Sequence, residues 1–158
     1  MAASQLLAIY DAIAAMSVSA GGVTPQVWDV DEVRDSVHTA HLPVRILLPH
    51  GEFAGGGALG QGFRPVTLDS IARGTWLITD LCLWRPVGQG LGTRDIGDVL
   101  VEYCGAYATA LVTRGRGTTH QSFINGWNIA AGVYAFPESS GNWFWGVRAV
   151  VQVDEIIS

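Results

Sequence analysis

Apolar and polar residues alternate along the chain in a way that predicts several regular elements. In residues 4 to 16 the apolar side chains follow helical spacing, and Ser4 is the predicted N-cap. Residues 23 to 30 predict a short strand or an extended arm, and Pro25 favours an edge position for it. Residues 29 to 41 are polar and acidic and predict a solvated loop or one helical turn, before a short apolar strand at 42 to 49.

The clearest strand runs from Thr75 to Trp84. Its side chains are apolar on both faces, which predicts a central strand covered on both sides. Asp80 is the exception, because it shares a face with Trp76, Ile78, Cys82 and Trp84. We interpret it either as the mark of a face covered by a neighbouring subunit or as a strand end that reaches water.

The last part of the chain predicts a helix followed by a β-hairpin. The helix begins at Thr93 or Asp95 and keeps its apolar spacing to about residue 113. Strands at 122–136 and 142–155 are joined by a turn at 137–141, and Trp143 and Trp145 are placed on the core face of the second strand. The chain is therefore predicted to be a single α+β domain over residues 1–158. It would have a mostly antiparallel sheet of about four to five strands, two helices packed on one face, and a long Gly-rich loop.

That loop spans residues 50 to 65 and holds six glycines, so no regular element is expected there. Long loops in compact domains usually have a function, and this one carries Phe53, Leu59 and Phe63 as candidate docking side chains. Three of its glycines satisfy a bare G-x-G-x-x-G pattern. The residues that follow, through Arg64 and Pro65, do not open a helix, so we reject a nucleotide-binding loop.

Composition favours association with other proteins. Of the 158 residues 49% are hydrophobic and only 15% are charged, against roughly 25% charged in ordinary domains. We expect the excess apolar area to be buried in an interface; a monomer with a Ser/Thr/Gly surface is the alternative. The net charge of −5 argues against non-specific nucleic-acid binding.

All nine cationic residues are arginines, whose planar guanidinium suits paired contacts at interfaces, although coding bias also explains the missing lysine. The arginines near the central strand and the loops are candidate interface residues together with Asp80: Arg64, Arg73, Arg85 and Arg94.

A search for chemistry leaves no catalytic or metal site. Cys82 and Cys104 fall in buried patterns, there is no C-x-x-C and no G-x-S-x-G, and the loop histidines His38, His41 and His50 are expected to be solvated. We therefore expect no enzyme activity, no cofactor and no metal. Trp28 and Trp127 lie outside the core pattern and are candidate interface anchors. Neither a signal peptide nor an apolar run of about 18 residues is present, so no membrane association is expected.

Three segments carry a family resemblance. The helix starting Ser4-Gln5-Leu6-Leu7, the strand Leu42 to Pro49, and the stretch from Thr75 to Val87 leading into the helix at 95–113 resemble the tail terminator, or tail-completion, family of long-tailed (siphovirus-type) phages. The resemblance covers most of the chain as an order of elements and carries no catalytic motif.

The resemblance implies a virion protein, assembled in the host cytoplasm, that forms a homo-hexameric ring. Its partners would be further copies of itself, the tail tube protein and the head connector or neck protein, with DNA passing through the lumen without sequence-specific recognition. The alternatives are another neck, tail-joining or tube component, and a small-ligand-binding or enzymatic domain that uses Trp28, Trp127 and the histidines.

Overall fold

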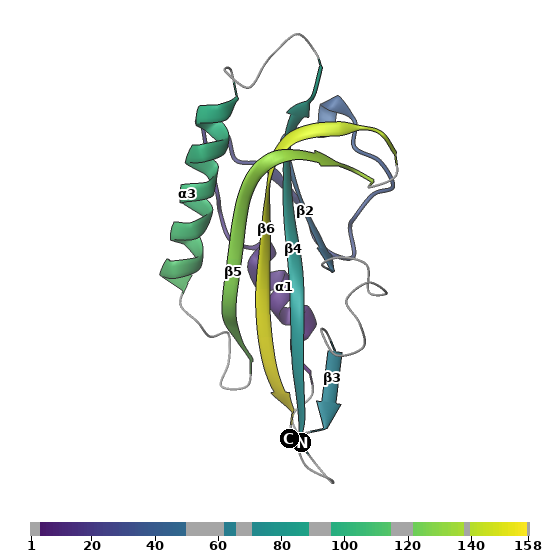
Figure 1. The fold of residues 1–158 in the computed structure, drawn as a ribbon, viewed down its shortest axis with the longest axis vertical. Helices are drawn as coiled ribbons and strands as arrows, with labels where there is room; N and C mark the ends of the chain where they lie inside the picture. The colour runs from purple at the N-terminus through teal and green to yellow at the C-terminus, as the bar shows by residue number, and fades with distance from the viewer. Residues whose placement is uncertain are drawn as a thin grey trace.

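A single sheet organises the fold. The computed structural model describes residues 4–49, 62–65, 71–88, 96–114, 122–137 and 140–157. The sheet has the strand order β1-β2-β4-β6-β5, with β3 pairing with β4 off this path, and the two α-helices found among these residues complete the α+β class expected from sequence (Figure 1). The elements in chain order are α1 Leu6–Ala14, β1 Gln26–Trp28, the 3-10 helix η1 Thr39–His41, β2 Val44–Pro49, β3 Gly62–Pro65, β4 Ala72–Pro86, α3 Gly97–Arg114, β5 Ser122–Ala135 and β6 Trp143–Ile157.

Among the described strands, pairing is antiparallel at every contact but one. β4 pairs with β2, β3 and β6, and β5 pairs with β6, all antiparallel. β1 and β2 are parallel, although we expected strands adjacent in sequence to pair antiparallel. The reason is that residues 29–43 lead the chain back along β1 before β2 begins, so both strands run in the same direction.

Both helices pack on one face of the sheet. Ile9 and Ile13 of α1 and Leu100, Tyr103 and Tyr107 of α3 share one core with the inward side chains of the strands (Leu47, Ile78, Cys82, Val147, Ala149, Val151 and Val153). This confirms the alternation expected along β4. In Figure 1, α1 lies behind the long strands and α3 runs beside β5.

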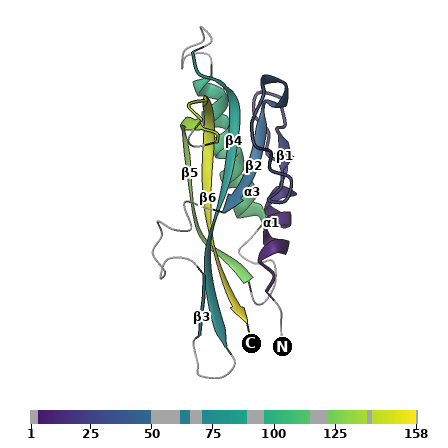
Figure 2. The ribbon, with the colours of Figure 1, turned by 90° about the vertical axis from the view of Figure 1, so that its right-hand side faces the viewer.

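A second core covers part of the opposite face. The upper ends of β5 and β6 bend across the sheet (Figure 1), and Phe136 and Phe144 pack there against Trp28, Ile46 and Leu83. Figure 2 shows the sheet from the side, with β1 and β2 at one margin and β5 at the other. Because α3 and the residue 29–43 segment cover opposite faces, β4 is central and buried from both sides, as its sequence predicted.

Three local predictions were wrong. Gln5 takes the N-cap position of α1 in place of Ser4, because the buried Glu155 accepts bonds from the Gln5 backbone N–H and, at 2.9 Å, from the Ser4 hydroxyl. Gly62–Pro65 forms β3 within the stretch expected to be irregular, because it pairs with β4. Trp143 is 52% exposed and therefore not a core residue, because β6 begins there at the rim of the sheet.

Candidate subunit interface

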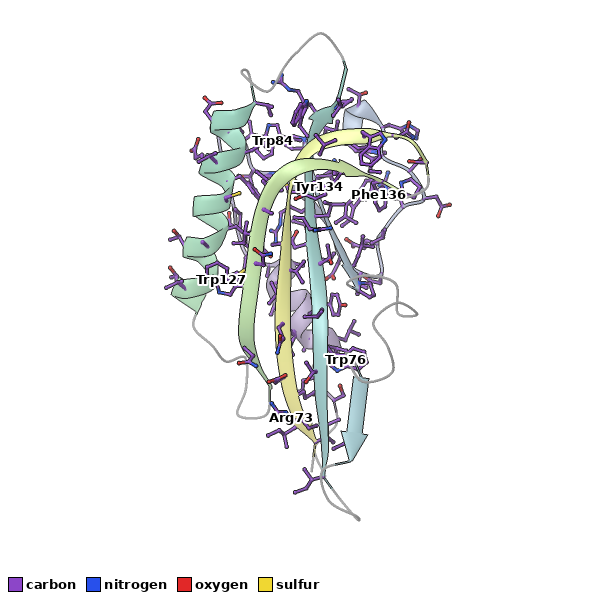
Figure 3. The ribbon with its side chains drawn as sticks, in the orientation of Figure 1. Arg73, Trp76, Trp84, Trp127, Tyr134 and Phe136 are labelled. Carbon is purple, nitrogen blue, oxygen red and sulfur yellow. The ribbon has the colours of Figure 1, made fainter. Side chains whose placement is uncertain are left out.

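The sheet ends at β5, which therefore supplies one of its edges. β5 is bonded to β6 along one side, and within the described chain no strand pairs with its other side. Trp127 and Val133 are exposed, at 44% and 37% of their surface. Trp127 is in register with Val151 of the helix-side core, so its indole lies on the α3 side of β5 (Figure 3). This half-exposed aromatic fits the anchor role predicted for it, which stays a prediction.

Exposed apolar side chains also occur on the outer side of α3. Val101 and Val112 are 69% and 71% exposed and stand eleven residues apart, which places them on one side of the helix. Single exposed valines are ordinary on protein surfaces. Together with the exposed side chains of β5 and Trp143, they nevertheless leave considerable apolar area uncovered in an isolated subunit.

Asp80 is an interior residue held by partners from its own chain. The Arg45 and Asp80 side chains are 1% and 0% exposed and form an ion pair, and the Tyr107 hydroxyl donates to Asp80 at 2.7 Å. Arg45 also donates to the carbonyl of Ile13 in the last turn of α1 and to that of Met16, two residues past its end. The expectation that Asp80 faces a neighbouring subunit or water is therefore wrong, since the chain's own helices cover this face. The cluster ties α1, β2, β4 and α3 together.

Two buried ionisable groups, Cys82 beside this cluster and Tyr10 of α1, predict alkaline unfolding. Burial raises the pKa of Cys82 from 9.0 to about 12 and that of Tyr10 from 10.0 to about 12. Both groups keep their protons more tightly in the folded chain than in the unfolded one. The free energy of unfolding should therefore stay flat up to about pH 9 and fall between pH 9 and 12. Urea denaturation at pH 8, 9, 10 and 11 measures this; constant stability up to pH 11 would contradict it.

Trp28 is likewise buried, at 4% exposure, in the second core. The edge of its indole meets the His41 ring, with centroids 5.1 Å apart, and the Arg34 guanidinium lies over it at 5.2 Å. The prediction that Trp28 is an interface anchor is wrong, because the curled hairpin and the residue 29–43 segment already bury it.

The two arginines of β4 that sequence proposed for an interface differ in their surroundings. The Arg73 side chain is 45% exposed and pairs at 3.1 Å with Asp154, which is buried and also accepts bonds from Thr75 and Asn125. Arg85 is partly buried, and its Nε and Nη2 atoms are enclosed without a hydrogen-bond partner. Buried donors of this kind cost about 1–3 kcal/mol each. The interface roles of both residues stay predictions.

The remaining sequence-predicted residues fall in or beside the Gly-rich loop and ahead of α3. Phe53, Leu59 and Arg94 lie outside the described residues, as do His50 and residues 50–61 as a whole. For Phe63 and Arg64 the backbone position in β3 is described, opposite Gly74 and Arg73 of β4. Their roles in docking stay predictions.

A pocket of about 400 Å³ lies where the turn after β4 meets the turn of the β5–β6 hairpin. Its lining includes His38, Thr39, Asn142 and Trp143. His38 and His41 are neighbours, and the His41 Nδ1 accepts a bond from the His38 backbone N–H at 3.1 Å. Desolvation and the charges of Arg34 and His38 lower the pKa of His41. Trp28, His38 and His41 are therefore brought together, whereas Trp127 stands on β5 at the opposite edge of the sheet.

Comparison with known proteins adds no relative: no protein-family model matches the sequence, and no curated protein is significantly similar to it. Within the part of the chain that the structure describes, no helix is long and apolar enough to cross a membrane. The same residues contain no group of three or more His, Cys, Asp or Glu side chains placed to hold a metal ion.

Sequence reasoning did not single out β5 as an edge. A signal was present, because residues 122–135 contain no charged residue and no proline. The signal has meaning only once the strand order is known, since an uncharged strand in the middle of a sheet is ordinary.

Proposed function

We propose that this chain is a structural virion protein, a tail terminator whose copies form a ring that caps the tail tube and joins it to the head or neck. One observation carries the proposal: the uncovered apolar side of β5 and α3, in a chain with only 15% charged residues. Such a surface on a soluble subunit favours association with protein. The step from association to a phage tail rests on the resemblance of the three segments described above.

The internal architecture suits a ring subunit. The buried Arg45–Asp80–Tyr107 cluster fixes both helices to the sheet, so the subunit can present rigid surfaces to its neighbours. A closed ring uses heterologous contacts, in which one patch meets a different patch on the next copy. The sheet offers two different margins for this purpose, β5 on one side and β1 on the other. DNA passing through the lumen would require no base-specific contact.

The test is assembly of the purified full chain. We expect native mass spectrometry at micromolar concentration to give six copies, and electron microscopy to show rings that attach to one end of tail tubes and stop their growth. A stable monomer that does not attach to tubes would contradict the proposal. Open stacks of rings would instead favour a tube subunit, the alternative within the same structural class.

The pocket beside Trp143 favours a second candidate, a small-ligand-binding domain. Its volume of about 400 Å³ lies within the usual range of ligand sites, and His38, Thr39 and Asn142 supply hydrogen-bonding groups. This function predicts that His38→Ala removes binding or turnover of a small molecule and leaves assembly unchanged.

A further inference from the structure

The outer edge of β5 lacks the features that normally protect an edge strand. Unpaired N–H and C=O groups on an exposed edge strand can pair with a strand of another molecule. Natural proteins prevent this with charged residues, prolines, bulges or short edge strands. β5 is 14 residues long, without a charged residue or a proline, and its single register shift, between Ile124 and Gly126, lies near one end.

The other edges of the same sheet are protected. β1 has only three residues and is preceded by Pro25. β3 has four residues, among them Arg64 and Pro65. The contrast within one sheet shows that β5 alone, among the described strands, offers a long unprotected edge.

We propose that the outer edge of β5 is a strand-addition surface, filled by an extended segment of a second copy of this chain. The inference rests on the proposed function, which requires contacts between copies, and it specifies β5 as the site of one such contact. Backbone hydrogen bonds would extend the sheet from one copy into the next, and the side chains on the α3 side of β5 would become buried: Trp127, Ala131 and Val133.

Charge favours a second copy as the occupant. Each copy carries a net charge of −5, so two copies repel each other wherever their acidic surfaces meet. β5 carries no charge, so like copies can approach here without placing like charges opposite each other, which is destabilising across paired strands. A strongly charged partner would find no complementary group on this strand.

Hydrogen exchange distinguishes strand addition from docking of side chains alone. In the isolated subunit every second amide of β5 points away from β6 and should exchange quickly. In the assembled wild-type protein the same amides should exchange at least about tenfold more slowly, because they are bonded to the next copy. The amides bonded to β6 should be slow in both states.

The variant Ala131→Lys supplies the isolated subunit, because an exposed lysine on an edge strand blocks addition. It should be monomeric by native mass spectrometry with an unchanged melting temperature. The matched control Leu7→Lys changes a 64% exposed side chain on α1, outside the proposed interface, and should assemble like the parent. If Ala131→Lys fails to fold, the exchange measurement is made on wild-type protein at assembling concentration and after dilution.

The outcomes separate the inference from the proposed function. Rings whose outward β5 amides stay fast, or an Ala131→Lys protein that still forms rings, would overturn strand addition and leave the terminator proposal intact. Dimers in which the outward β5 amides exchange slowly would support strand addition and contradict the proposed ring. Wild-type protein that stays monomeric at high concentration would overturn both.

Discussion

Replacing Asp80 with alanine is expected to lower the free energy of unfolding by about 3–5 kcal/mol, because it leaves the Arg45 guanidinium buried without its carboxylate. Arg45 is 1% exposed, and its other acceptors are backbone carbonyls at the end of α1. The Tyr107 hydroxyl loses its acceptor as well. Equilibrium denaturation in urea, followed by circular dichroism, measures the loss.

Another Arg–Asp pair among the described residues provides a control. Arg73 is 45% exposed, and the buried Asp154 keeps its bonds from Thr75 and Asn125, so Arg73→Ala should cost less than Asp80→Ala, about 1–3 kcal/mol. The double variant Arg45→Met/Asp80→Leu should be more stable than Asp80→Ala, since no uncompensated charge remains in the interior. A loss under about 1 kcal/mol for Asp80→Ala would show that water or a rearranged partner reaches Arg45.

The variant Gly146→Ala is expected to destabilise the fold by about 3 kcal/mol or more, at or beyond the upper end of ordinary overpacking. A Cβ at position 146 would stand 2.3 Å from the Cys82 carbonyl oxygen, and that oxygen belongs to the backbone of the neighbouring strand and cannot turn aside. Gly146 faces Leu83, next to the register shift between β4 and β6. The close approach of the two strands therefore requires glycine.

Gly126→Ala is the control for this prediction. A Cβ at Gly126 meets nothing within 4 Å, and alanine is favoured over glycine inside a strand by about 0.5–1 kcal/mol. Its denaturation midpoint should be unchanged or slightly higher. Equal stability of Gly146→Ala and Gly126→Ala would show that β4 and β6 can separate at Cys82 without cost.

Much of the fold follows from local periodicity. The two faces of β4, the helical spacing of Ile96 to Leu111, and the final hairpin were correctly predicted because each element buries a regularly spaced set of apolar side chains. Asp80 was placed on the correct face and given the wrong neighbours. The alternation of side chains along a strand shows which face of the sheet a residue points to. The residues that bury it on that face come from elements distant in sequence.

The two tryptophans proposed as interface anchors also show that local pattern does not determine burial. Trp28 looked free in sequence because its short strand carries little pattern, and it is buried by Phe136 and Phe144, more than 100 residues away. Trp127 has a similar sequence context and is half exposed, because its strand ends the sheet. The two tryptophans differ in the position of their strands in the sheet.

The sequence by itself determined that this chain is an α+β domain with a two-sided central strand, few charges and an uncharged stretch at residues 122–135. Spacing, composition and turn residues are local properties and can be read along the chain. Only the tertiary structure decided that Asp80 is sealed beneath α1 and α3 by Arg45 and Tyr107. It also decided that β5 stands at the edge and that β1 runs parallel to β2. These outcomes depend on the order in which distant strands pair, and that order is set by the packing of the whole core rather than by any one segment.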